Sequence, residues 1–134
     1  MIKKLLIINI VLISQLLFIN SAYALQILDK CENKDSTNEE ISRCLDVIKN
    51  TTDRELQTWV NNHLFNLEEK ALVDGRYSAL KMFKRSQSNF VTFRDNDCRW
   101  QYLLISPEKG ADIAYKKCYI VLSQFRIKEL SKIQ

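Results

Sequence analysis

The stretch QSNFVTFRDNDC, residues Gln87–Cys98, decides the fold. Its apolar residues and its cysteine recur every three or four positions, which places Phe90, Arg94 and Cys98 close to one face of an α-helix. The same spacing continues in both directions and predicts a helix from about Tyr77 to about Leu104. The positions expected to point inward on this helix are Tyr77, Leu80, Phe83, Gln87, Phe90, Phe93 and Cys98.

The residue types of this stretch do not combine into a catalytic site. Cysteine catalysis needs a free thiolate with a base in reach, and nothing in the sequence brings the only histidine near Cys98. Asp95 and Asp97 lie two positions apart, so they diverge on a helix. We interpret the stretch as scaffold, with Cys98 bonded and Arg94 partly buried against an acid. Asp53 and Asp97 are the candidate acids.

A longer helix is expected before this one, from about Thr37 to about Leu72. Ser36–Glu39 reads STNE, a capping box in which the serine and the glutamate satisfy each other's backbone amides. Thr52–Glu55 reads TDRE, a second box that allows a break or kink near Asn50–Thr51. One face of the helix carries Ile41, Leu45, Ile48, Thr52, Leu56, Trp59 and His63.

Two stop signals divide the helical patterns. Asp74-Gly75 ends the first, and the loop Ser106–Gly110 (SPEKG) ends the second. A last helix is expected from about Ala111 to about Lys132, with Ala114, Cys118, Val121 or Leu122, Phe125 and Leu130 inward. Only two glycines and one proline occur, which disfavours a turn-rich all-β fold. The sequence predicts an all-α domain, a small antiparallel bundle of three to four helices stapled by two disulfides.

The N-terminus resembles a secretory signal peptide covering residues 1–24. Lys3 and Lys4 precede an apolar run, and small residues stand at Ala22 and Ala24. The alternative, a retained membrane anchor, needs a run of roughly 20 apolar residues and a basic cluster behind it. We therefore expect a periplasmic or secreted domain over residues 25–134, with no stable membrane insertion after cleavage.

The net charge and the cysteines restrict which partners and which covalent links are expected. The net charge is +4, and loss of Lys3 and Lys4 leaves +2, which is too small to indicate nucleic-acid binding. Four cysteines in a small exported domain indicate disulfides, whereas zinc binding would call for a C-x-x-C pair that the chain lacks. Of the three possible connectivities, the helix layout favours Cys31–Cys44 and Cys98–Cys118, each worth about 3 kcal/mol. No metal or other cofactor is expected.

Three ordered motifs resemble the lysozyme inhibitor LprI N-terminal-like family, also known as the domain of unknown function DUF1311. They are Asp53-x-x-Leu56, the Gln87–Cys98 stretch, and Cys118-x-x-x-Leu122-Ser123-x-x-Arg126-x-x-x-Leu130. Cys44 matches the family's cysteine in the first helix. The motif positions expected to be structural are Asp53, Leu56, Gln87, Phe90, Phe93, Arg94, Asp95, Leu122 and Arg126.

Three departures accompany the resemblance, which spans Cys31 to Leu130. The family usually has Trp and Tyr where this chain has Phe90 and Phe93, and Asn where it has Gln57. A Gly-Gly-Ser segment between the family's last two cysteines is replaced here by Leu104–Gly110. A partner that touches this loop can therefore differ from the partner of other members.

The resemblance implies a small exported helical binding protein, and one member type inhibits lysozyme. A lysozyme cleft holds two carboxylates, so a hydroxyl or ammonium inserted there would be bound. Ser106 and Lys109, on the loop between the last two cysteines, are the candidate contacts with a protein partner such as lysozyme or a related cell-wall lytic enzyme.

A second hypothesis is an interaction or immunity-type module of the cell envelope with another protein partner. Trp100, Tyr102 and Leu103 would supply its contact patch if they are exposed. An enzyme is not expected, because no nucleophile, base and orienting group occur at a recognisable spacing.

Overall fold

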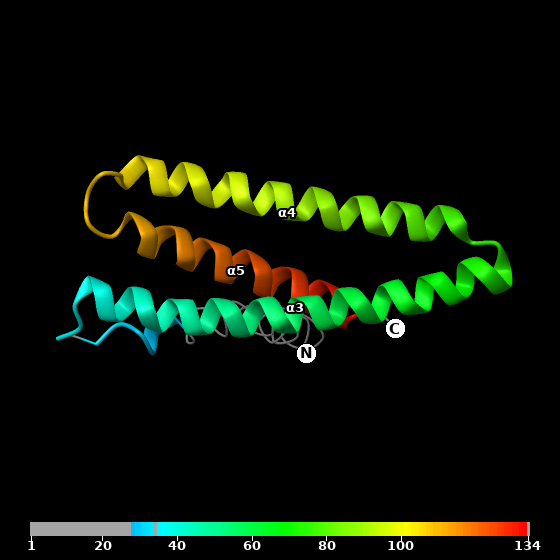
Figure 1. Cartoon of the computed structure of the whole chain (residues 1–134), viewed down its shortest axis with the longest axis horizontal. Coiled ribbons are helices and arrows are strands. Elements are labelled where there is room, and N and C mark those ends of the chain that lie inside the picture. Colours follow the sequence, from blue (N-terminus) through cyan, green and yellow to red (C-terminus); the bar gives the residue numbers. More distant parts are fainter. Residues whose placement is uncertain (1–27, 34, 134) are drawn as a thin grey trace, which may run out of the picture.

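The computed structural model describes residues 28–33 and 35–133, and three long helices contain most of these residues. They are α3 (Asn38–Asp74), α4 (Tyr77–Ile105) and α5 (Ala111–Ser131), and successive helices run antiparallel (Figure 1). The described residues contain no strand, so the prediction of an all-α bundle is confirmed. The predicted signal peptide lies outside the described residues. None of the described helices combines the length and the apolar character needed to span a membrane.

α3 begins at a capping box one residue later than the sequence predicted. Thr37, not Ser36, has the extended backbone of a cap, with φ −74° and ψ 157°. Its hydroxyl accepts a hydrogen bond from the amide of Glu40, and Glu40 Oε2 accepts one from the Thr37 amide at 2.8 Å. The prediction of a Ser36–Glu39 box was therefore wrong, because TNEE fits the same pattern as STNE. The hydrogen bonds that the Thr37 amide and hydroxyl donate to the Glu40 carboxylate lower the pKa of that carboxyl.

α3 is one long helix, as predicted, and it continues through Asn50–Thr51, where the second capping box allowed a break or kink. The second predicted capping box, Thr52–Glu55 (TDRE), does not start a helix. Thr52 lies inside α3, faces the core and is 4% exposed. The Thr51 hydroxyl donates to the carbonyl of Val47, one turn back in the same helix. The helix ends at Gly75, whose φ of 69° is a left-handed conformation that favours glycine.

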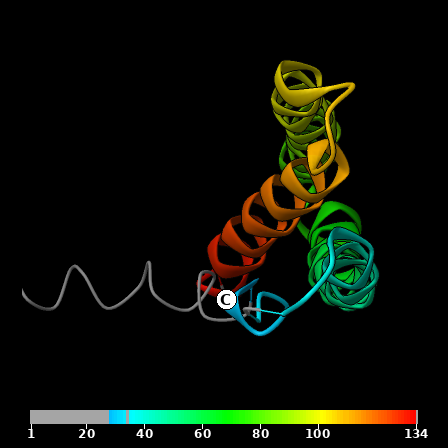
Figure 2. The same cartoon turned by 90° about the vertical axis from the view of Figure 1, so that its left-hand side faces the viewer.

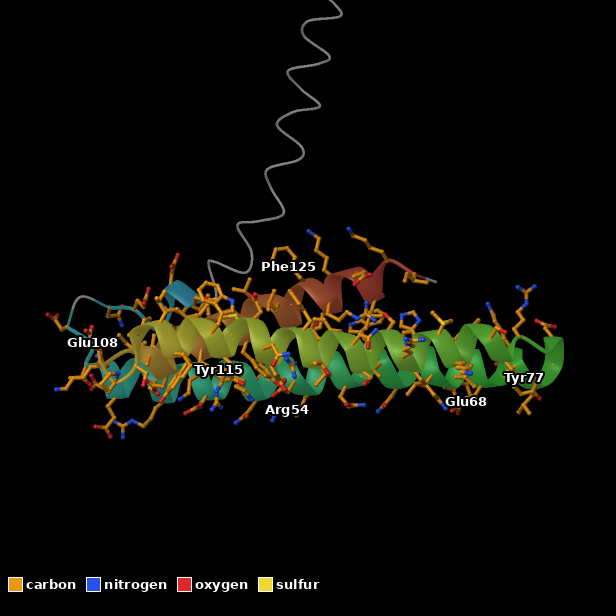
Figure 3. All side chains as sticks on the ribbon, turned by 90° about the horizontal axis from the view of Figure 1, so that it is seen from above. Arg54, Glu68, Tyr77, Glu108, Tyr115 and Phe125 are labelled. Atoms are coloured by element: carbon orange, nitrogen blue, oxygen red, sulfur yellow. A yellow bond between two sulfur atoms is a disulfide. The ribbon has the colours of Figure 1, made fainter. Side chains whose placement is uncertain are left out.

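The bounds of α4 and α5 agree with the sequence prediction within a residue or two, but some inward positions do not. Tyr77, Phe93 and Phe125 are more than half exposed. Tyr77 lies at the far end of α4, beyond the reach of α5 (Figure 3). The buried face of α5 instead consists of Ala111, Tyr119, Ile120, Ser123, Arg126, Ile127 and Leu130. Two of these buried residues, Ser123 and Arg126, are polar, so the spacing of apolar residues alone does not identify this face.

The core has two parts along the bundle. One joins the N-terminal arm to α3 and α5 through Leu28, Cys31, Leu45 and Ile120. The other joins α3 to α5 through Leu56, Val60, Ile127 and Leu130, with Phe83 and Phe90 of α4 packed against it. Seen along the bundle, the arm runs below α3 and α5, away from α4 (Figure 2).

Both predicted disulfides are present. Cys31–Cys44 ties the arm to α3, with Cα atoms 5.7 Å apart, and Cys98–Cys118 ties α4 to α5, with Cα atoms 5.4 Å apart. Both lie in the half of the bundle that carries the α4–α5 loop. At the other end α5 stops first: the Leu130 carbonyl lies 2.9 Å from His63 Nε2, and α3 continues to Asp74. The α3–α4 hairpin therefore projects beyond α5 (Figure 1).

The cap at the start of α3 can be tested by alanine substitution. Thr37→Ala removes the side-chain acceptor of the first turn and should lower the free energy of unfolding by about 1 kcal/mol. Ser36→Ala, one residue earlier, is the control and should change it by less than about 0.5 kcal/mol. Urea unfolding followed by circular dichroism measures both. A larger loss of stability in Ser36→Ala than in Thr37→Ala would show that Ser36 caps the helix.

Candidate functional site

Arg94 on α4 is the residue at which all three helices meet, and it is 6% exposed. Its Nη1 donates a hydrogen bond of 3.0 Å to Ser123 Oγ on α5 and lies 3.9 Å from Asp53 Oδ1 on α3. Its guanidinium carbon stands 3.7 Å from the ring centre of Tyr119 on α5. The predicted burial of Arg94 against an acid is confirmed, with Asp53 as one acid.

The other predicted acid, Asp97, does not pair with Arg94. Its two carboxylate oxygens accept hydrogen bonds from Trp100 Nε1 at 3.1 Å and from Gln101 Nε2 at 3.4 Å. The second carboxylate close to Arg94 is that of Asp95, whose Oδ1 lies 3.5 Å from Arg94 Nε. The prediction of Asp97 as a candidate acid for Arg94 was wrong, because the Asp97 carboxylate is bonded to Trp100 and Gln101 instead.

A second arginine, Arg126 on α5, makes the neighbouring contact with α4. Its Nε donates to Gln87 Oε1 and its Nη2 to Ser86 Oγ, both at 3.2 Å. The ring of Phe90 lies between the two arginines, 5.5 Å from the guanidinium carbon of Arg94 and 5.6 Å from that of Arg126. Motif positions that are far apart in sequence thus form one stack along the α4–α5 contact.

The remaining motif positions divide between core and surface. Leu56 is buried in the core, and Leu122 is half-buried. Phe93 is the exception, because its side chain is 55% exposed. Phe93 therefore does not contribute to the core, although its place in the motif predicted that it would.

Tyr119, which the sequence did not single out, completes the Arg94 contact. Burial raises its pKa well above the usual range, although the positive charge of Arg94 opposes the shift. Its hydroxyl therefore stays protonated at physiological pH and cannot act as a base. Lys49 lies over the same ring at 4.2 Å. The cluster has the chemistry of a helix clamp rather than of a catalytic site.

The two candidate partner contacts lie on the loop between α4 and α5. Ser106 is half-buried at the C-cap of α4, and its amide donates to the Tyr102 carbonyl at 2.9 Å. Lys109 is exposed, and so is Glu108, which lies at the loop end of the bundle (Figure 3). Gly110 closes the loop with a φ of 104°.

The start of α5, next to the loop, is held to α3 by a polar cluster. Lys116 Nζ donates to Ser42 Oγ at 2.7 Å and to Asp46 Oδ2 at 2.8 Å. The Ser42 hydroxyl in turn donates to Asp112 in the first turn of α5. With the Cys98–Cys118 bond on the α4 side, both ends of the loop are anchored. Spacing within one helix gave no signal of this cluster, because its contacts are between helices.

Exposed apolar residues gather on α4 just before the loop. Trp100 is 55% exposed, Leu103 58% and Leu104 76%. A shallow groove of about 190 Å³ lies between this end of α4 and the start of α5, and Arg99, Tyr102, Asp112, Tyr115 and Lys116 line it. Within the described residues no cluster of His, Cys, Asp or Glu could hold a metal ion.

The comparisons with known proteins give one match. The family model described as "Lysozyme inhibitor LprI" matches residues 30–130. No curated protein and no solved structure matches the chain. The matched residues include all four cysteines, Arg94 and Arg126.

The clamp role of Arg94 predicts a loss of stability when the guanidinium is removed. Arg94→Ala should lower the free energy of unfolding by about 3 kcal/mol, because it breaks a buried pair and leaves the Ser123 hydroxyl without its donor. Arg85→Ala, on the exposed face of the same helix, is the control and should cost less than about 0.5 kcal/mol. Unchanged thermal unfolding of Arg94→Ala would contradict the clamp.

Proposed function

The chain belongs to the LprI lysozyme inhibitor family, and on this premise we propose that it is an exported binding protein that inhibits lysozyme or a related cell-wall lytic enzyme. The α4–α5 loop, with Lys109 and Ser106, is the part that enters the partner's cleft. The observation that carries the proposal is an exposed ammonium on a loop whose two ends are anchored.

The chemistry of the cleft supports this choice of loop. Lysozyme cleaves its substrate with two carboxyl groups, one acting as the acid and the other ionised. An ammonium close to an ionised carboxylate forms a charge-assisted hydrogen bond, which is stronger than a bond between neutral groups. Lys109 is exposed and forms no ion pair with the described residues, so no bond within this part of the chain must be broken before it binds.

The anchoring of the loop also supports the proposal. Cys98 and Cys118 bind the two helices that enter and leave it, and Lys116 fixes the start of α5 on α3. A loop already held in its bound conformation loses less conformational entropy on association, and that saving appears as affinity. A small protein with a modest net charge gains little from long-range steering toward a basic lysozyme, so this local rigidity matters more.

The function is binding rather than catalysis. His63 is the only histidine, and its Nε2 lies 2.9 Å from the Leu130 carbonyl, far along the bundle from the loop. Tyr119 stays protonated for the reason given above. An envelope module with another protein partner is the second candidate, and the exposure of Trp100 and Leu103 favours it. In that case the contact would involve the apolar end of α4 more than Lys109.

The loop contact can be tested with a charge reversal. Lys109→Glu should weaken inhibition of a chicken-type lysozyme by at least about tenfold, because a carboxylate would then face the catalytic carboxylates. Ser106→Ala should weaken it by about 1 kcal/mol, the worth of one neutral hydrogen bond. The control is Lys81→Glu, which makes the same charge change on the exposed far end of α4. A turbidity assay on cell-wall substrate, with both disulfides intact, measures all three.

Two outcomes would contradict the proposal at different levels. No inhibition at large molar excess in low salt would remove this class of lysozyme as the target. Inhibition that Lys109→Glu and Lys81→Glu reduce equally would keep the target but exclude the loop. The contact would then lie at Trp100 and Leu103.

Glu108 gives a second test, with an effect of opposite sign. It is an exposed carboxylate next to Lys109, so in an acidic cleft it opposes binding. Glu108→Gln should therefore strengthen inhibition about two- to fivefold at low ionic strength, and added salt should reduce the gain. Weaker inhibition by Glu108→Gln would mean that Glu108 contacts a basic rim and that the loop does not face the catalytic carboxylates.

A further inference from the structure

A second apolar row runs along α4 on its solvent side. Met82, Phe93, Trp100 and Leu104 are each more than half exposed, yet they recur at whole numbers of helical turns and share one face. Three smaller exposed residues, Ser86, Asn89 and Asn96, fill the gaps in the same row. The one charged residue on this face is Asp97, which is half-buried and accepts a hydrogen bond from Trp100 Nε1 within the row. An exposed row of this length with four large apolar side chains indicates an interface.

Two pairs of residues in the row are placed symmetrically about Phe93. Ser86 and Trp100 lie about two turns from it in opposite directions, and Met82 and Leu104 lie about three turns from it. If two copies of α4 pack antiparallel on a two-fold axis at Phe93, Trp100 of each copy meets the small Ser86 of the other. Leu104 meets Met82, and the two phenylalanines meet each other. Such self-complementarity is what a two-fold interface requires.

α5 extends the same face beside the midpoint of the row. The α4–α5 pairs Arg94–Ser123 and Phe90–Arg126 show that Leu122 and Phe125 lie level with the neighbourhood of Phe93. Phe125 is 56% exposed, and its side chain projects outward from α5 (Figure 3). The described part of the N-terminal arm packs on α3 and α5 at the other side of α5, away from this face (Figure 2).

Charge favours the antiparallel arrangement over a parallel one. The first half of α4 carries Lys81, Lys84 and Arg85 and no acid. The exposed or half-buried charges of its second half and the following loop are three acids, Asp95, Asp97 and Glu108, against two bases, Arg99 and Lys109, so this half is weakly acidic. Antiparallel packing sets the basic half of one copy over the weakly acidic half of the other, whereas parallel packing sets the two basic halves together.

The size of the face is in the range of a reversible dimer. From Met82 to Leu104 the row is about 33 Å long at 1.5 Å per residue, and α4 with α5 is about 20 Å wide. The product, about 660 Å², is close to the roughly 800 Å² that each partner buries in a standard interface. Such a face is large enough for association and too small for an obligate dimer.

We infer that the α4–α5 face binds a second copy of this chain, in an antiparallel two-fold dimer centred on Phe93. The inference does not rest on the proposed function. In this dimer the two α4–α5 loops lie at opposite ends, so each Lys109 stays accessible to a separate partner. Leu103 also stays exposed, because it projects away from the row.

Sedimentation equilibrium of the purified protein over a wide concentration range tests the association. The protein should be in a concentration-dependent equilibrium between monomer and dimer. Phe93→Glu places two carboxylates on the axis and should raise the dissociation constant about a hundredfold or more. Phe65→Glu is the matched control: Phe65 is 69% exposed on α3, and the dimer should persist. A monomer at every concentration, or a dimer that Phe93→Glu leaves intact, would overturn the inference.

Cross-linking tests the arrangement itself. In Phe93→Cys the new thiols of the two copies meet on the axis, so mild oxidation should give a covalent dimer. In Met82→Cys the new thiols lie near opposite ends of the interface and should not link. Equal linking of the two variants would indicate a parallel dimer and overturn the antiparallel one. A monomeric protein that loses lysozyme inhibition in Phe93→Glu would assign the face to lysozyme and also overturn it.

Discussion

The structure depends on one buried guanidinium. Arg94 takes a partner from each of the other two helices, a carboxylate on α3 and a hydroxyl and an aromatic ring on α5. A buried charge is tolerated only where its partners are in place. The position of α5 over α3 and α4 is therefore fixed at this level of the bundle, and apolar residues need only fill the space on either side. The two core clusters do so, one on each side of Arg94.

This constraint explains why α5 turns a partly polar face inward. Ser123 and Arg126 are buried because they pair with α4, through Arg94 and through Gln87. The larger apolar residue Phe125 is left outside as a result. The same choice on α4 buries Arg94 and Cys98 and leaves Phe93 exposed. Both helices therefore carry exposed apolar residues on one common face. That face is the surface through which we infer that the dimer forms.

Most of the fold can be predicted from the sequence, because helix ends and disulfides have local signals. Gly75 and the SPEKG loop mark the ends, and the arm and the loop restrict how four cysteines can pair. The inward face of α5 cannot be predicted in this way, since Ser123 and Arg126 look like surface residues until their partners on α4 are known. The capping box illustrates a smaller limit: STNE and TNEE both fit the pattern, and only the backbone at Thr37 decides between them.

The candidate site follows the same division. The loop and Lys109 stand out in the sequence because they lie between two cysteines. What holds the loop does not, since the Lys116–Ser42–Asp46 contacts join residues about 70 positions apart. These contacts and both disulfides lie at the loop end of the bundle, whereas the hairpin end has two helices and neither disulfide. Local opening begins where buried contacts are fewest, which is at the hairpin. The bundle is thus stiffest beside the loop that presents Lys109, and a stiff loop is the one that a cleft can bind at the least entropic cost.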